Sequence, residues 1–349
     1  MSGTSLDGID AVLFDFSRNR LVGKHYLPYD DELRQAILDL HTPSSGELHR
    51  AQLIANRLAG LYADAILSLL AAIGHAPERI AAIGCHGQTI RHCPEQGYTL
   101  QIGNAALLAE LTKIAVVSDF RSRDIAAGGQ GAPLVPAFHD RIMRDPEQYR
   151  VIVNIGGISN LTDLKPGRST FGYDCGPGNL LMDAWCKLHK REPYDAGGAW
   201  AATGRVIPAL LSKMLSEKYF SLPPPKSCGR DLFNMSWLNG LLDGGESPED
   251  VQATLLELTC RAIADQIEDR CAIYLCGGGA KNLTLKKRLA KLLPDSTVQT
   301  TNELGVDSDY LEAIAFAWLA QQNLTGKPAN LPEVTGARHP CILGAIYPA

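Results

Sequence analysis

The sequence lacks any paired cysteine motif, although it contains 9 cysteines. No two of them form a C-x-x-C pair, so the ligand spacing of a structural zinc site is absent. An odd number of cysteines also disfavours a complete disulfide framework. We therefore expect free thiols in a reducing compartment.

Long hydrophobic runs are missing as well. The longest apolar stretch, residues 61–73, is interrupted by Asp64 and Ser68 and falls short of the ~18 residues that a membrane-spanning helix needs. Residues 1–10 are polar and glycine-rich, without the basic and apolar regions of a secretory signal. These absences predict a cytoplasmic protein with no membrane partner.

Long basic runs are also absent, and the densest basic stretch, residues 281–291, is interpreted as a solvated helix face. Lys and Arg number 33 against 38 Asp and Glu, which leaves a formal net charge of −5. Binding to nucleic acid requires grouped Lys and Arg to neutralise phosphates, so we expect no nucleic-acid partner. The chain is 45% hydrophobic and 20% charged, an ordinary globular composition, and 349 residues are typical of about two domains.

The sequence does contain strand-like apolar runs that alternate with amphipathic helical stretches, the pattern of an α/β fold. The predicted strands are residues 11–16, 24–29, 80–85, 98–102, 114–117, 150–155, 161–164, 170–173, 272–276 and 298–301. The predicted helices are residues 31–41, 47–73, 179–190, 205–217, 248–269, 282–293 and 310–322. Both halves begin with a glycine-containing turn and a hairpin, which suggests two related lobes.

Three glycine-rich turns are candidates for binding an anionic ligand, because glycine lets backbone amides approach phosphate oxygens closely. The first turn consists of Gly3, Thr4, Ser5, Leu6, Asp7, Gly8, Ile9 and Asp10. The second contains Asn154, Gly156 and Gly157 after an apolar strand. The third contains Gly277, Gly278, Gly279 and Asn282 between a strand and a helix. Taken singly, each turn is also compatible with a simple structural turn.

Neither common nucleotide-binding fingerprint is present. The sequence has no G-x-x-x-x-G-K-[ST] motif and no G-x-G-x-x-G motif between a strand and a helix. A P-loop protein and a Rossmann protein are therefore disfavoured. Two phosphate turns, one at the start of each lobe, followed by a late glycine turn resemble the superfamily of actin, sugar kinases and heat-shock chaperones.

Within that superfamily the sequence resembles the anhydro-N-acetylmuramic acid kinase family. Seven blocks carry the resemblance in one order: residues 2–10, 86–92, 101–104, 119–121, 126–136, 154–160 and 174–179. The resemblance implies two actin-like (ribonuclease H-like) lobes around an ATP cleft. We expect residues 1–136 with 310–349 to form the N-terminal lobe and residues 137–309 to form the C-terminal lobe.

The resemblance also implies the reaction. The family hydrolyses the 1,6-anhydro bridge of anhydro-N-acetylmuramic acid and phosphorylates the freed 6-hydroxyl with ATP, in cell-wall recycling. Asp174 aligns with the catalytic carboxylate that acts as base toward water, whereas on its residues alone it could form a turn or cap a helix. Mg²⁺ is expected with ATP, held largely by the nucleotide, and Asp7 is the expected metal-proximal residue. A homodimer is expected from the resemblance alone.

The sugar-binding candidates are polar residues of the matching blocks. A lactyl carboxylate and an acetamido group require a cationic fork and amide groups. The candidates are His86, Gln88, Arg121, Arg123 and Gln130. His86 could instead be a packed core histidine, and Asp183 is expected to be a solvated or capping carboxylate.

Three alternatives remain open at the level of sequence. A phosphatase or hydrolase of the same superfamily would attack phosphate with water. A nucleotide-dependent binding module would need a separate peptide-binding domain, for which the length leaves no room. An inactive homologue is suggested because the superfamily places a strand before the first turn, whereas this sequence begins at Met1 next to that turn. Either the chain begins short or another segment covers that position of the sheet.

Overall fold

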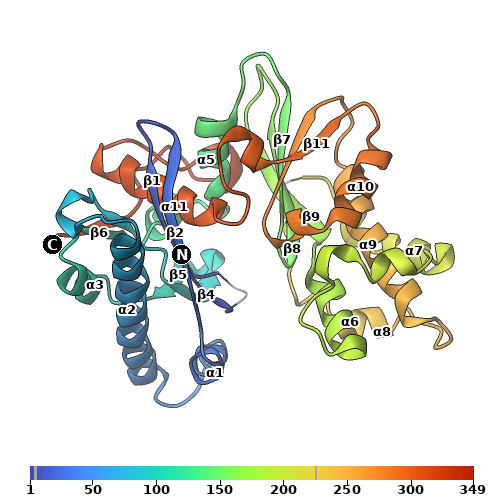
Figure 1. The fold of residues 1–349 in the computed structure, drawn as a ribbon, viewed down its shortest axis with the longest axis horizontal. Coiled ribbons are helices and arrows are strands. Elements are labelled where there is room, and N and C mark those ends of the chain that lie inside the picture. The colour runs from blue at the N-terminus through green and yellow to red at the C-terminus, as the bar shows by residue number, and fades with distance from the viewer. Residues whose placement is uncertain (4–5, 225) are drawn as a thin grey trace. The chain divides into compact units, whose positions relative to one another are not determined.

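The computed structural model describes residues 1–3, 6–224 and 226–349 (Figure 1). The chain divides into two compact units. Unit 1 comprises Met1–Phe138 and Tyr310–Ala349, and unit 2 comprises His139–Asp309. Each unit combines strands and helices, so the predicted α/β class is confirmed.

Unit 1 contains three small sheets. Their strands are β1 (Gly8–Asp15), β2 (Arg20–Pro28), β3 (Ile83–Gly84), β4 (Gln88–Cys93), β5 (Tyr98–Ile102), β6 (Val116–Ser118) and β12 (Ala345–Tyr347). Strands β1 and β2 form an antiparallel hairpin, β4 and β5 form a second one, and the third sheet has the order β12-β6-β3. Among the described residues β1 pairs only with β2, and β3 pairs only with β6. An apolar cavity of about 470 Å³ is lined by residues of both β1 and β3.

Helices cover these sheets. They are α1 (Asp31–Asp39), α2 (Glu47–Ala72), α3 (Ala105–Thr112), α4 (Ser122–Ala126), α11 (Leu311–Leu324) and α12 (Pro332–Thr335), with α5 (Val135–Met143) running across the boundary into unit 2. Of the helices in the described ranges, only α2 is long and apolar enough to cross a membrane. Its buried side chains, among them Leu58 and Tyr62, pack into the core of unit 1, which is typical of a core helix.

Unit 2 is built on one five-stranded sheet of order β11-β10-β7-β8-β9. The strands are β7 (Arg150–Ile155), β8 (Ile158–Leu164), β9 (Phe171–Pro177), β10 (Ala272–Cys276) and β11 (Thr297–Thr300). Strands β7, β8 and β9 form an antiparallel meander, whereas β10 is parallel to both β7 and β11. The α-helices of unit 2 are α6 (Leu180–Lys190), α7 (Pro208–Leu215), α8 (Met235–Asn239), α9 (Pro248–Ala264) and α10 (Leu283–Leu292).

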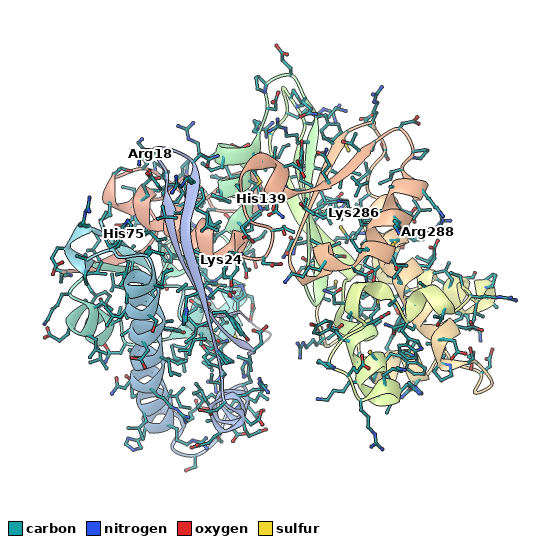
Figure 2. All side chains as sticks on the ribbon, in the orientation of Figure 1. Arg18, Lys24, His75, His139, Lys286 and Arg288 are labelled. Carbon is teal, nitrogen blue, oxygen red and sulfur yellow. The ribbon has the colours of Figure 1, made fainter. Side chains whose placement is uncertain are left out.

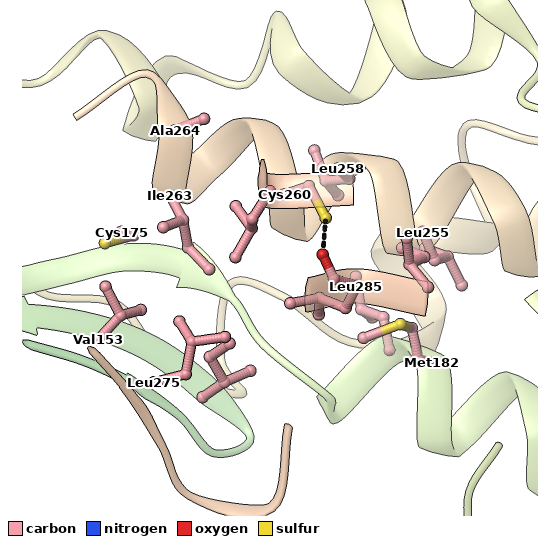
Figure 3. Packing of buried hydrophobic residues seen from close by; sticks show 14 of the residues in the cluster. Val153, Cys175, Met182, Leu255, Leu258, Cys260, Ile263, Ala264, Leu275 and Leu285 are labelled. Carbon is pink, nitrogen blue, oxygen red and sulfur yellow. Dashed lines mark hydrogen bonds between the residues drawn. The ribbon is translucent and has the colours of Figure 1, made fainter. Parts of the chain in front are cut away.

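Helix α9 is the central helix of unit 2, since 13 of its 17 residues are buried. Figure 3 shows its apolar side chains packed against the sheet and α10, with Cys260 contacting the carbonyl of Leu285. The buried Glu257 accepts hydrogen bonds from Arg261 and from Arg288 of α10, which Figure 2 labels. Although burial raises the pKa of Glu257, the two arginines together hold it below its ordinary value. This ion pair therefore ties α10 to α9.

Several predicted elements have different boundaries in the structure. The predicted strand 80–85 contracts to β3, and residues 8–10, assigned to the first turn, belong to strand β1. Strands β4 and β12 and helix α3 are not among the predicted elements. Strand β4 was missed because its residues Gln88, Arg91 and His92 give it a polar composition, although it pairs with β5 across a register irregularity between Thr89 and Arg91.

Candidate functional site

Asp174 lies inside β9 of unit 2, opposite Asn160 of β8. Oxygen Oδ2 accepts hydrogen bonds from the Ser227 hydroxyl at 3.0 Å and from the Cys228 backbone N–H at 3.1 Å. Oδ1 receives no hydrogen bond from any residue in the described ranges. One oxygen of the carboxylate is thus held and the other is open to a ligand.

The predicted position of Asp174 after the end of a strand is wrong. The strand predicted for residues 170–173 ends before Asp174, but β9 continues through Gly176 and Pro177. An irregularity between Ser159 and Asn160 shifts the register, so that pairing extends to Ile158 opposite Pro177. The carboxylate is therefore fixed by a sheet rather than by a loop.

The surroundings of Asp174 are poorly solvated. Burial raises the pKa of its carboxyl group, and the hydrogen bonds from Cys228 and Ser227 partly oppose that rise. The Tyr219 hydroxyl donates to the Asp174 carbonyl at 2.7 Å, and the Asp174 N–H donates to the Lys226 carbonyl at 3.1 Å. The ammonium of Lys226 lies 5.1 Å from the centre of the Tyr219 ring. Such a carboxylate is a stronger proton acceptor than a fully solvated one.

The second and third glycine turns meet in unit 2. Gly156 and Gly157 form the turn between β7 and β8, and their carbonyls accept the N–H groups of Asn179, Gly178 and Leu180. Gly277 follows β10 with φ of +78°, and a Cβ placed there would lie 2.4 Å from Oδ1 of Asn154. The two turns therefore pack so closely that glycine is required at position 277.

The other residues of the third turn have distinct environments. A Cβ at Gly279 would lie 2.2 Å from the Ile155 side chain, whereas at Gly278 the nearest atom, of Asn179, is 3.8 Å away. Asn282 is buried and caps α10 by accepting the Leu285 N–H. Its capping role is established by the geometry, and its role toward a nucleotide stays a prediction.

Asp183 lies one helical turn after Asn179 on α6. Burial, reinforced by the negative charge of Asp195, raises the pKa of Asp183 to about 7. The sequence predicted a solvated or capping carboxylate, and the structure shows the Asp183 side chain as partly buried.

The first glycine turn is in unit 1. Thr4 and Ser5, both predicted to contact the nucleotide, lie outside the described residues. Leu6 is buried in the core with φ of +56°, and the Asp7 carbonyl accepts the Tyr26 hydroxyl at 2.9 Å. Among the residues that the structure describes, no group of three or more His, Cys, Asp or Glu could hold a metal ion. The Asp7 side chain is exposed, and its role near a cation stays a prediction.

His86 and Arg121 form a hydrogen-bonded pair in unit 1. The Nδ1 of His86 lies 2.8 Å from the Gly87 carbonyl, which requires a proton on Nδ1. Nε2 then accepts from Arg121 Nε at 3.1 Å and from Nη2 at 2.9 Å. Burial, and secondly the charge of Arg121, lower the pKa of His86, so this histidine is neutral.

Gln88, two residues after His86, presents an unsatisfied acceptor. The side chain is fully buried, and its Nε2 donates to the Gly3 carbonyl at 3.2 Å. Its Oε1 has no hydrogen-bond partner within the described part of the chain. A buried carbonyl without a donor is costly, so a ligand N–H or O–H would be well accommodated here.

A cavity of about 260 Å³ in unit 1 brings three of the predicted blocks together. Its lining includes His86, Gln101, Asn104 and Asp119. Asp119 adopts φ of +57°, an uncommon conformation for a residue with a side chain. The structure thus joins blocks that are separate in the sequence.

The remaining sugar candidates are not part of this group. Arg123 is exposed and lines a different surface cavity with Pro340 and Cys341. The Gln130 side chain is exposed, and its backbone N–H donates to the Thr335 carbonyl at 2.7 Å. His86 and Arg121 are therefore bonded to each other, Gln88 bonds to the Gly3 carbonyl, and Arg123 lies at a different cavity.

Sequence reasoning missed two further groups. Glu312, at the start of α11, has an exposed side chain, yet desolvation by the surrounding protein raises the pKa of its carboxyl group, with the charge of Arg121 opposing the rise. Ser227, which holds Asp174, follows a proline-rich stretch without a motif. No local signal marks Glu312, since the neighbouring residues of α11 are apolar.

The whole chain, residues 1–349, matches the family model of anhydro-N-acetylmuramic acid kinase. The chain belongs to this family. It is 59% identical to the anhydro-N-acetylmuramic acid kinase of Nitrosospira multiformis, with 100% of this chain and 98% of that protein covered. It is 48% identical to the enzyme of the same name from Neisseria gonorrhoeae, with 99% of this chain and 97% of that protein covered.

Solved structures give a more distant likeness. The activator of 2-hydroxyisocaproyl-CoA dehydratase from Clostridium difficile, with bound ADPNP, has a TM-score of 0.43 at 13% identity over 90% of this chain and 94% of that one. The ROK hexokinase from Thermus thermophilus has a TM-score of 0.39 at 15% identity over 91% and 96%. Family membership itself makes the chain a kinase, a transferase that uses ATP.

Proposed function

We propose that this kinase hydrolyses the 1,6-anhydro bridge of anhydro-N-acetylmuramic acid and phosphorylates the freed 6-hydroxyl, with ATP as donor. The products are N-acetylmuramic acid 6-phosphate and ADP, in the recycling of cell-wall material. Family membership supports the substrate class. The observation that carries the mechanism is the poorly solvated Asp174, of which Oδ2 is held and Oδ1 is open.

In the proposed reaction Oδ1 of Asp174 accepts a proton from water while the water oxygen bonds to the anomeric carbon. The bond between that carbon and the bridging oxygen breaks, and its electron pair stays on the 6-oxygen. The 6-oxygen attacks the γ-phosphorus, and the bond to the ADP oxygen breaks. A positioned base contributes roughly 10²–10⁴-fold to such a rate.

The glycine turns of both units are proposed to hold the nucleotide. Gly156, Gly157 and Gly278 leave room for phosphate oxygens near backbone amides, since a Cβ at each would meet no atom within 3.5 Å. When bound, Mg²⁺ neutralises charge on the phosphates, and Asp7 is the proposed protein group nearest to it. Chelation of divalent cations should therefore abolish transfer without unfolding the protein.

The sugar is proposed to contact His86, Gln88 and Arg121 of unit 1. Arg121 supplies a planar cation suited to the lactyl carboxylate, although its nitrogens already bond to His86 and to the Gly131 carbonyl. Oε1 of Gln88 is suited to accept the acetamido N–H, because it lacks a partner in the described chain. Gln130 and Arg123 stay as further candidates whose side chains would have to reach the substrate from exposed positions.

The function is tested by incubating the protein with Mg-ATP, with and without anhydro-N-acetylmuramic acid, and measuring ADP and the product mass. Sugar-dependent ADP formation with a phosphorylated product supports the proposal. ADP release that is the same without sugar would indicate a phosphatase or ATPase. Sugar and ATP binding with no turnover would indicate an inactive homologue.

The remaining proposals concern the cellular setting. We propose that the protein acts as a homodimer in the cytoplasm, without nucleic-acid or membrane partners. Light scattering coupled to gel filtration measures the mass directly. A monomer across micromolar concentrations would contradict the dimer.

A further inference from the structure

Asp124 of α4 carries a carboxylate that is fully buried. Its Oδ1 accepts hydrogen bonds from Asn330 Nδ2 at 2.6 Å and Thr335 Oγ1 at 2.7 Å, and its Oδ2 accepts from the Gly131 N–H at 2.7 Å. Among the described residues no Lys or Arg forms an ion pair with it. A buried carboxylate held by three neutral donors depends on all of them for its solvation.

Gly131 connects the Asp124 carboxylate to Arg121, one of the proposed sugar-binding residues. Its N–H donates to Asp124, and its carbonyl accepts Nη1 of Arg121 at 2.8 Å. The same guanidinium donates through its other two nitrogens to His86. A shift of Gly131 would therefore move the acceptor that orients Arg121.

The loop around Gly131 is tightly constrained. A Cβ at Gly129 would lie 2.2 Å from Oδ2 of Asp124, and Gly131 has φ of +68°. The C-terminal segment also holds this loop, because the Thr335 carbonyl accepts the Gln130 N–H at 2.7 Å and the Ala127 carbonyl accepts the Arg338 N–H at 2.9 Å. Asp124 thus joins the loop to residues more than 200 positions away in the sequence.

We propose that Asp124 is a positioning residue for the sugar site. It fixes Gly131, and through the Gly131 carbonyl it holds the Arg121 guanidinium in the orientation that receives the carboxylate of the substrate. The C-terminal residues Asn330 and Thr335 hold the Asp124 side chain in place through their hydrogen bonds to Oδ1. This inference rests on the proposed function, because it assigns Arg121 to the carboxylate of the sugar.

The main test is Asp124→Asn in the full chain. The amide keeps the shape of the side chain, but its NH₂ group must face one of the three donors, so one hydrogen bond is replaced by a repulsive contact. We expect the KM for anhydro-N-acetylmuramic acid to rise about 10-fold or more, and the KM for ATP to stay within about twofold. The inhibition constant of 1,6-anhydro-N-acetylglucosamine, which lacks the lactyl carboxylate, should stay unchanged.

Two further variants make the test decisive. Asp64→Asn changes an exposed carboxylate on α2 and serves as the matched control, with no expected change in either KM. Thr335→Val removes only the hydroxyl that donates to Oδ1 and should raise the KM for the sugar by about threefold. If Asp124→Asn does not fold, Thr335→Val tests the positioning role of Asp124 in its place.

The outcomes separate this inference from the proposed function. An unchanged KM for the sugar in both variants, or equal rises for sugar and ATP, would overturn the positioning role. A rise in the inhibition constant of the analogue equal to the rise in KM would also overturn it, because the effect would not pass through the carboxylate. A wild-type protein that does not phosphorylate the sugar would overturn the proposed function and this inference together.

Discussion

The hydroxyl of Ser227 donates a hydrogen bond to Oδ2 of Asp174 across 3.0 Å, and the backbone N–H of Cys228 donates to the same oxygen. Both donors stabilise the charged carboxylate, whereas burial destabilises it. The balance of these effects sets the fraction of Asp174 that can act as a base. The opposite oxygen, Oδ1, is left for the proposed water.

Substitution of the base is the first prediction. Asp174→Asn keeps the hydrogen-bonding shape but cannot accept a proton, so kcat should fall by roughly 10²–10⁴-fold. The KM for ATP should change little, because the glycine turns are untouched. Steady-state kinetics at pH 7 and thermal unfolding check this. A variant that keeps more than about a tenth of wild-type kcat would contradict the role of Asp174 as base.

The second prediction concerns pH. Ser227→Ala removes a donor to the charged form of Asp174, so the pKa of Asp174 should rise further above its ordinary value. The acid limb of the kcat/KM profile should then move to higher pH, because a higher pH is needed to deprotonate the carboxyl group of Asp174. Ser216→Ala, an exposed serine of the same unit, is the control and should leave the profile in place. An unshifted acid limb for Ser227→Ala would show that another group limits the rate.

The third prediction distinguishes two effects of replacing a glycine by alanine: strain in the backbone, and a clash between the new Cβ and a neighbouring atom. Gly167 and Gly277 have φ of +71° and +78°, but only Gly277 has a neighbouring atom, Oδ1 of Asn154, in the space of a Cβ. Gly167→Ala should cost about 1–2 kcal/mol of unfolding free energy through its backbone conformation alone. Gly277→Ala should cost more and should also raise the KM for ATP, because Asn154 and the second turn must move. Denaturant unfolding and kinetics measure both effects, and equal losses of stability with an unchanged KM would count against the close packing of the two turns.

The fourth prediction follows from a buried histidine of unit 2. His139 (Figure 2) lies 2.9 Å from Thr162 Oγ1, and burial lowers its pKa to about 3. The unfolded chain binds a proton at this residue below about pH 6.5, whereas the folded chain does not. Stability is therefore fully present above about pH 6.5 and is lost as the pH falls toward 3, by about 1.36 kcal/mol per unit for this group.

His139→Gln should reduce the pH dependence of the unfolding free energy by the contribution of one bound proton, although the variant itself is less stable. Urea unfolding at pH 7.5, 6 and 5 measures it. His49→Gln, on the exposed face of α2, should leave the slope unchanged. If wild type and His139→Gln lose stability in parallel between pH 7 and 5, then His139 is not buried in its neutral form.

The sequence predicted the parts of the site that depend on short motifs. The second and third glycine turns follow β7 and β10 as expected, because strand-glycine-glycine patterns are local. Asn179 and Asn282 also lie at the starts of α6 and α10, where such residues favour helix initiation. Asp174 was recognised through its block but placed in a turn, because Gly-Pro-Gly signals a turn more often than a strand. Only the pairing register of β8 and β9 resolves that conflict.

The contacts that orient these groups could not be predicted from sequence patterns, because they join residues that are far apart in the sequence. Ser227 is 53 positions from Asp174, and Thr335 is 211 positions from Asp124. Such pairs depend on how the chain folds back, and their residue types are common at surfaces as well as in sites. Arg121 and Arg123 illustrate the same limit, since two arginines two positions apart have different environments in the structure.

The most direct test of the central claim is the fate of the water oxygen. The protein is incubated with Mg-ATP and anhydro-N-acetylmuramic acid in ¹⁸O-water, and the product mass is compared with that of unlabelled product exposed to the same water without enzyme. The account predicts a product that carries one phosphoryl group and one ¹⁸O atom at the anomeric carbon, beyond the exchange in the control. A phosphorylated product without the label would contradict it, because phosphorylation would then proceed without the water that Asp174 is proposed to activate.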